Sequence, residues 1–242
     1  MTNRHSRRSA LLLAAAWPLP AAAFDLGRLF GEKGSGRVIH HEAEFGEFDA
    51  LEIGGDLQVV VLQAQPPRLI IDTDDNLVPL IVAELKGRTL RLRQKAALAP
   101  TRLAITVNAW ILQRVEVSGS AALSLPRFVS KQLRADASGS AHIAFDALTT
   151  ETLEVHLAGA ARMTIAGRAN DFSAAVAGSG VLAASAFEAR RVSVNLAGAG
   201  VADVWAVDTL SGAAAGAANL RYRGDPRVGV ARAGAANVAR KS

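Results

Sequence analysis

Residues 133–140 read LRADASGS, residues 153–160 read LEVHLAGA and residues 192–199 read VSVNLAGA. Four more copies of this pattern lie between residues 113 and 235: QRVEVSGS at 113–120, FSAAVAGS at 172–179, LSGAAAGA at 210–217 and VGVARAGA at 228–235. The glycine that all seven copies share recurs at intervals of 20, 20, 19, 20, 18 and 18 residues. A repeat of this length is typical of a solenoid, in which each copy forms one coil and the coils stack.

Apolar and polar residues alternate on both sides of each shared glycine. The side chains six, four and two residues ahead of it are almost all apolar, as Leu153, Val155 and Leu157 show. A second apolar series begins four residues after the glycine, as at Ile143 and Phe145. Period-two alternation indicates strands that bury one face. Each coil therefore has two such strands, and the glycine supplies the sharp corner between them.

These patterns predict an all-β fold, a single-stranded parallel β-helix (β-solenoid) with coils of 18–20 residues. The general crossover rule favours a right-handed coil. In the last copy Arg232 occupies an inward position, and Arg240 and Lys241 follow it. We therefore expect the last coil to be frayed or protected by charge against edge-to-edge association.

The first 23 residues have the organisation of a signal peptide. Arg4, Arg7 and Arg8 form a basic head, residues 9–17 an apolar core, and Ala21–Ala23 a small-residue cleavage site before Phe24. The paired arginines are compatible with a twin-arginine route as well as the general one. We expect an exported bacterial protein, periplasmic or at the cell surface, with no transmembrane span in the mature chain.

Composition narrows the function classes further. Without cysteine, the chain has no disulfide, no thiolate catalysis and no lipidated cysteine. Removal of the leader takes away three arginines and no acid, which leaves 24 basic and 22 acidic residues. No basic stripe interleaved with aromatic residues occurs, so we expect no nucleic-acid partner.

The region before the repeats divides into two parts. Residues 24–44 are Gly-rich and charged and are interpreted as a flexible lead-in, with no P-loop in GEKGSGR (31–37). Residues 45–112 are predicted to form a β segment that starts and caps the solenoid, while residues 113–242 form the repeats. The expected strands of residues 45–112 cover residues 48–53, 57–62, 69–71, 90–92 and 103–107.

Two short polar motifs are interpreted as structural. The side chains of His40 and His41 point to opposite faces of an extended chain, which disfavours a metal site. Residues 72–76 read DTDDN and resemble the start of a calcium loop, but Leu77 stands at the glycine position and Ala83 at the closing glutamate position. We interpret the segment as a turn, and we expect no metal and no cofactor.

Several segments, taken in order, resemble the bacterial GIN-domain family, the head of putative auto-transporter adhesins. They are EFDALEIGGDLQVVVLQ (47–63), RLIIDTDDNLVPLIVAELKGRTLRLRQ (68–94), LAITV (103–107) and VEVSGSAAL (115–123), followed by the glycine-punctuated repeats. The resemblance covers about residues 45–240 and implies an exported β-helical domain of unknown function. The chain has Gly54-Gly55-Asp56 where the tripeptide that names the family would align. The family supplies no catalytic residues.

Outward-facing polar residues are the candidate site residues. Asp136 and His156 fall in one column of adjacent coils, with Asn195 two coils further on, and His142 pairs with Arg162 in another column. Our first hypothesis is a non-catalytic binding, adhesive or structural module of the cell envelope, which engages glycans or outer-membrane and surface proteins. The alternative is a carbohydrate-active enzyme or polysaccharide-binding β-helix that uses the Asp/His column. Scarce aromatic platforms and the lack of a catalytic set favour the first, so we expect no enzyme.

Overall fold

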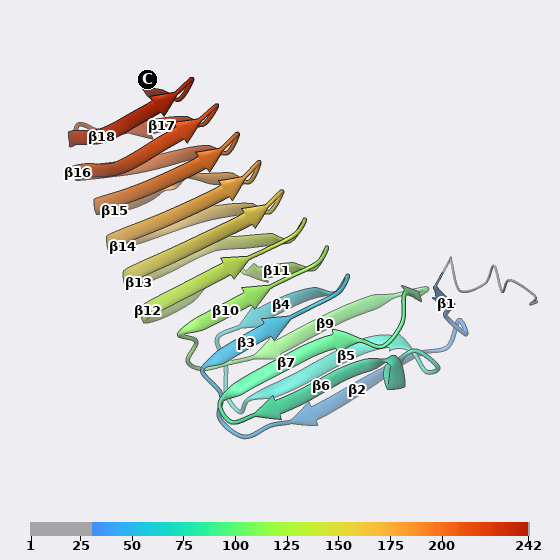
Figure 1. Ribbon diagram of the computed structural model, residues 1–242. Helices are drawn as coiled ribbons and strands as arrows, with labels where there is room; N and C mark the ends of the chain where they lie inside the picture. Colours follow the sequence, from blue (N-terminus) through green and yellow to red (C-terminus); the bar gives the residue numbers. More distant parts are fainter. Residues whose placement is uncertain (1–30, 242) are drawn as a thin grey trace, which may run out of the picture.

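The computed structural model describes residues 31–241 and shows an all-β solenoid (Figure 1). The predicted signal peptide and the first part of the lead-in lie outside the described residues. Within those residues no helix has the length and apolar character needed to cross a bilayer.

The elements follow one another in chain order with one short 3-10 helix among the strands. They are β1 (Glu32–Lys33), β2 (Val38–Glu44), β3 (Ala50–Ile53), β4 (Gln58–Leu62), β5 (Arg68–Asp74), η2 (Val78–Leu80), β6 (Ile81–Lys86), β7 (Thr89–Gln94), β8 (Leu98–Ala99), β9 (Leu103–Asn108), β10 (Arg114–Val117), β11 (Ala122–Leu125), β12 (Phe128–Ala137), β13 (His142–Gly159), β14 (Arg162–Gly178), β15 (Val181–Gly198), β16 (Val201–Gly216), β17 (Asn219–Arg223), β18 (Arg227–Gly234) and β19 (Asn237–Arg240).

Parallel pairing of successive coils confirms the predicted solenoid. Leu133 pairs with Leu153, Leu153 with Phe172, and Phe172 with Val192, which is the register that the repeat alignment requires. The strands β12 to β16 lie one above another along the stack (Figure 1). The right-handed sense of the coil stays a prediction.

The interior of the stack is the apolar core that the alternation predicts. Leu153, Val155 and Leu157 are at most 2% exposed, whereas Glu154 and His156, which lie between them in the sequence, are partly exposed. Phe172 and Phe187 pack edge to face, with ring centroids 5.4 Å apart. Aliphatic side chains with few aromatic rings therefore fill the core, as the composition indicates.

The shared glycines form a column at one corner of the stack. Gly178 has a φ of +101°, and a Cβ there would lie 2.6 Å from the carbonyl oxygen of Gly159 in the preceding coil. Both the backbone conformation and the close approach exclude a side chain. The same relation links each of the seven glycines to the one below it, and Gly119 to Gly55.

The N-terminal end shows that stack order differs from chain order. The strands β3 and β4 form one coil, onto which β10 and β11 stack in parallel after a long excursion of the chain. On the other side of that coil lie β7 and β9, also parallel to it. The antiparallel strands β5, β2 and β6 then complete this end (Figure 1). The N-terminal segment thus starts the solenoid and covers it.

The lead-in requires a correction. Residues 38–44, which the sequence analysis assigned to a flexible lead-in, form β2, which pairs antiparallel with β5. The preceding Gly-rich segment is bound by the DTDDN motif: Asp74 accepts hydrogen bonds from Gly36 N at 2.8 Å and Thr101 N at 2.8 Å. Gly34 lies so close to Asp74 that a Cβ would collide with the carboxylate. The motif ends in a turn as predicted, but Asp72–Asp74 belong to β5.

The C-terminal end is open. Val228, at a position that is buried in the coils below, is 45% exposed, and Arg232 lies in solvent. No further strand covers β18 or β19 within residues 31–241. One coil earlier, Val207 lies nine residues after its shared glycine, as the buried Phe187 does, yet Val207 is 40% exposed and Ala206 faces the core in its place. A shift in register along β15 and β16 causes this change.

Candidate functional site

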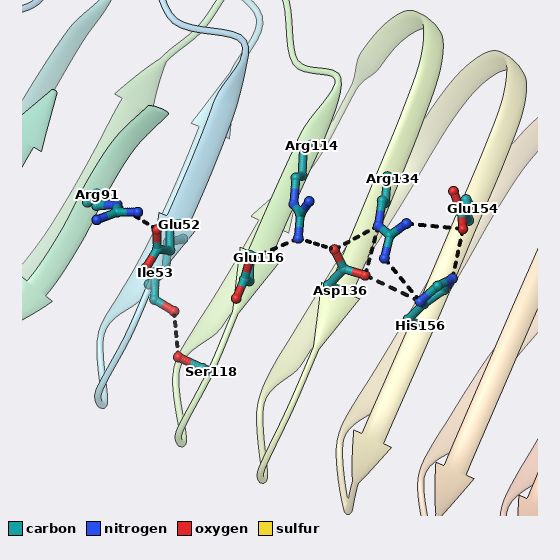
Figure 2. A network of polar contacts seen from close by, with 10 residues as sticks. All are labelled: Glu52, Ile53, Arg91, Arg114, Glu116, Ser118, Arg134, Asp136, Glu154 and His156. Atoms are coloured by element: carbon teal, nitrogen blue, oxygen red, sulfur yellow. Dashed lines mark hydrogen bonds and ion pairs between the residues drawn. The ribbon is translucent and has the colours of Figure 1, made fainter. Parts of the chain in front are cut away.

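Charged side chains cross the outer face of five neighbouring strands, β7, β3, β10, β12 and β13, in what we call the charge ladder (Figure 2). Parallel register places the members on the same face in two adjacent columns. The first column holds Arg91, Glu52, Glu116, Asp136 and His156, and the second holds Arg114, Arg134 and Glu154.

Ion pairs connect β10, β12 and β13 of the charge ladder, and a separate pair joins Arg91 on β7 to Glu52 on β3. Arg134 Nε lies 3.0 Å from Asp136 Oδ2, and Arg134 Nη1 lies 3.3 Å from Glu154 Oε1. His156 Nε2 lies 2.9 Å from Glu154 Oε1 and its Nδ1 lies 3.6 Å from Asp136 Oδ1. The hydrogen bond to Asp136 raises the pKa of Arg134. The pair predicted from sequence, Asp136 and His156, is therefore part of a larger network of ion pairs.

This arrangement leaves the charge ladder poorly suited to general acid–base catalysis. Asp136 Oδ2 also lies 3.2 Å from Arg114 Nη2, so two guanidinium groups contact its carboxylate. A general acid or base needs a titrating group free to exchange a proton with a substrate, whereas here His156 Nε2 lies 2.9 Å from Glu154 Oε1 and His156 Nδ1 lies 3.3 Å from Arg134 Nη2. We interpret the ladder as a structural surface network.

Asn195 lies apart from the other two residues of its predicted group. Ala175 stands between His156 and Asn195 in the column. From β14 onward these two columns carry small neutral side chains, with Ser173, Ser193 and Ser211 in the second column. The two columns therefore change from charged to neutral after β13, and Asn195 belongs to their neutral half.

The second predicted pair, His142 and Arg162, lines a groove of about 390 Å³ on a different face. The two residues are register partners on β13 and β14, and both are exposed. Their column continues through Ala122 on β11 to Gln58 on β4. The groove thus lies where the repeats join the N-terminal strands. A parallel row adds Val60, Ser124, Ala144 and Thr164, and β9 adds Ala104 and Thr106.

The groove differs from the charge ladder in its electrostatics. Its lining contains the cation Arg162 and the titratable His142 but no acid, and neither residue forms an ion pair with any residue in 31–241. Beyond the lining, Asp56 lies in an adjoining hollow that shares Gln58 with the groove. Methyl and hydroxyl groups cover most of the floor. The groove can therefore accept an extended ligand that carries negative charge or many hydroxyls.

A third polar cluster lies on the N-terminal strands. His40 Nδ1 is 2.7 Å from Asp72 Oδ1, and its Nε2 is 3.0 Å from Glu42 Oε1. The hydrogen bonds to Glu42 and Asp72 raise the pKa of His40. Among the residues that the structure describes, no group of three or more His, Cys, Asp or Glu side chains is arranged to hold a metal ion. The histidine serves here to link β2 to β5.

Sequence reasoning missed the residues that the N-terminal coil contributes. Gln58 of the groove and Glu52 of the charge ladder both come from this coil. A signal was present, since Leu51 and Ile53 precede Gly55 by four and two residues and Val59 follows it by four. The segment thus fits the repeat, but the intervening excursion of β5 to β9 obscures the period.

Comparisons with known proteins agree with this architecture. A family model described as "Putative auto-transporter adhesin, head GIN domain" matches residues 47–226. A crystal structure of a putative adhesin from Bacteroides fragilis aligns with a TM-score of 0.81 at 20% identity, over 87% of this chain and 100% of that one. A crystal structure titled as a putative lipid binding protein from Parabacteroides distasonis aligns with a TM-score of 0.75 at 22% identity, over 87% of this chain and 99% of that one. A crystal structure of a putative adhesin from Parabacteroides merdae aligns with a TM-score of 0.68 at 23% identity, over 87% of this chain and 99% of that one. No curated protein matches this chain. These likenesses show the fold.

Proposed function

Because this chain belongs to the GIN head-domain family of putative auto-transporter adhesins, we propose that it is an exported, non-catalytic binding module of the bacterial cell envelope. Three observations support the proposal. The N-terminus has the features of a signal peptide, the structural neighbours are titled as putative adhesins or as a putative lipid binding protein, and the acids of the charge ladder are paired with arginines.

We propose that the binding surface is the groove that contains His142 and Arg162, and that its ligand is an acidic polysaccharide of the envelope. One observation carries this choice: the groove presents a cation and no acid, whereas every acid of the charge ladder is paired with an arginine. A glycan chain suits a groove floored by small side chains, because its sugar rings need close approach and its hydroxyls need partners such as Gln58, Ser124 and Thr164.

Calorimetric titration with alginate oligosaccharides, a polyuronate probe, tests this proposal. We expect saturable binding that weakens as salt is added, because the interaction includes a charge pair at a solvent-exposed site. Neutral dextran is the control ligand, and it should bind at least tenfold more weakly. Equal binding of the two would leave Arg162 without the proposed role.

Variants locate the site. Arg162→Gln and His142→Ala are expected to lower alginate affinity about fivefold or more each, which corresponds to the ~1 kcal/mol of an exposed charged contact. Arg232→Gln, which removes an exposed cation on the last coil, is the matched control and should leave affinity unchanged. If Arg232→Gln reduced binding as much as Arg162→Gln, the attraction would be non-specific and the groove would not be the site.

A further inference from the structure

Exposed apolar side chains gather around a second hollow, of about 830 Å³, which we call the Trp110 patch. Eight large hydrophobic residues in the described chain are more than a third exposed, and four of them line this hollow: Leu62 (42%), Trp110 (53%), Ile111 (49%) and Val129 (56%). A contiguous exposed apolar patch of this kind marks an interaction surface.

The Trp110 patch is held in a fixed shape before any partner arrives. Trp110 and Ile111 project from the loop between β9 and β10, and the flanking Ala109 and Leu112 are fully buried. The side chain of Gln63 donates to the carbonyl oxygens of Trp110 at 3.0 Å and Val129 at 2.8 Å, and it accepts from Val129 N at 2.9 Å. One amide thus ties the loop to β12, so little conformational entropy is lost when the loop binds a partner.

The charge of the Trp110 patch is entirely positive. Arg127 and Lys131 are the charged residues in its lining, and no acid lines it. Neither forms an ion pair with another residue in 31–241. Acids appear only further along the same edge, where Glu151 and Glu188 share a separate hollow with Lys131. An apolar tip beside free cations is complementary to a surface that has a hydrocarbon interior and an anionic boundary.

We propose that the Trp110 patch docks the protein onto an anionic lipid bilayer. Trp110 and Ile111 enter the interfacial layer, where an indole ring places its apolar body in the acyl region and its N–H among the head groups. Arg127 and Lys131 contact lipid phosphates, and each basic residue near an anionic surface strengthens binding by about fivefold. This surface is separate from the groove, so the proposal does not depend on the acidic-polysaccharide ligand.

Vesicle flotation tests this proposal with the protein recovered after expression in a bacterium, its N-terminus established by mass spectrometry. The parent should float with vesicles of phosphatidylglycerol and phosphatidylcholine and at least tenfold less with phosphatidylcholine alone. The double variant Trp110→Ala/Ile111→Ser should lower partitioning about tenfold or more, and Arg127→Gln/Lys131→Gln about 25-fold on anionic vesicles only. Every variant carries the same N-terminus, so the differences report the patch.

Val207→Ser, which removes an apolar side chain that is 40% exposed elsewhere on the surface, is the control and should float like the parent. Circular dichroism melts of all variants establish that the fold is retained. Flotation of the parent that persists in the Trp110→Ala/Ile111→Ser variant overturns the proposal. So does a stable dimer that this variant dissociates in sedimentation velocity, because the patch would then be an interface between copies of this chain.

Discussion

The middle and the last coil of this solenoid place equivalent residues in opposite environments. Leu153 and Val228 both lie six residues before a shared glycine, yet Leu153 is fully buried and Val228 is 45% exposed. The difference lies in the neighbours, since Leu153 pairs with a coil on each side and Val228 with a coil on one side only. Burial in a stack is therefore a property of position along the stack as well as of the repeat.

The largest expected effect uses this pair directly. Leu153→Asp places a charge in the core and should destabilise the fold by about 5 kcal/mol or more. Val228→Asp leaves the charge in water and should change stability by less than about 0.5 kcal/mol. Urea unfolding followed by circular dichroism measures both. Equal losses would mean that the last coil is covered in solution.

A second pair compares glycines of the inner and the last coil. Gly212 has a φ of +129°, and a Cβ there would lie 2.0 Å from the carbonyl oxygen of Val194, whereas a Cβ at Gly229 meets nothing within 4 Å. Gly212→Ala should cost about 2–5 kcal/mol through backbone strain and overpacking. Gly229→Ala should stay within about 0.5 kcal/mol. Thermal melts decide the matter, and a Gly212→Ala protein as stable as the parent would contradict the close stacking of the coils.

The two ends should also differ in their response to acid. Asp74 is buried at the N-terminal end, and hydrogen bonds from the Thr101 hydroxyl first, then from the Thr101 and Gly36 amides, lower its pKa. A carboxylate with a lowered folded pKa contributes stability that is complete above its unfolded pKa, about 3.9, and is lost as pH falls further.

The urea midpoint should therefore be level above about pH 5 and fall below about pH 4. In Asp74→Asn this acid-dependent fall should become shallower. Asp225→Asn, at an exposed acid of the C-terminal end, should leave the slope of the parent. If Asp74→Asn kept the same slope, another group would have to account for the acid sensitivity.

The smallest expected effect concerns the charge ladder. His156→Ala removes a partly exposed partner of Glu154 and Asp136, and such surface pairs contribute less than about 1 kcal/mol. The melting temperature should drop by no more than about 2–4 °C. A loss comparable to that of Leu153→Asp would place His156 in the core and reverse the inside–outside assignment.

The inner coils could be predicted from the sequence and the ends could not, for a physical reason. Leu153, Val155 and Leu157 repeat a local alternation that any coil must have, so the pattern carries the information. The pairing of β3 with β10 depends on contacts that no local pattern encodes, and the missed strand β2 acquires its partner only when β5 is in place.

In the candidate surfaces too, the residues that follow the local repeat could be predicted, and those that depend on distant contacts could not. Asp136 beside His156 and His142 beside Arg162 could be read from the repeat register. Gln58 in the groove, and the joining of Leu62, Trp110 and Val129 in one patch, required the three-dimensional return of the chain. Sequence reasoning therefore found residues that the repeats contribute to the groove and to the charge ladder, and it found no residue of the Trp110 patch.

The excursion of the chain between β4 and β10 bears on how the molecule folds. In the coils from β12 to β16, paired residues are separated in the sequence by the length of one coil. Glu52 and Glu116, by contrast, are paired although β5, β6, β7 and β9 lie between them in the sequence. Local contacts form with less loss of chain entropy than distant ones. Folding should then nucleate among the C-terminal coils and propagate backwards, with the N-terminal strands adding last. During synthesis on the ribosome, these strands emerge first and should stay unpaired with the repeats until β10 and β11 have been synthesised.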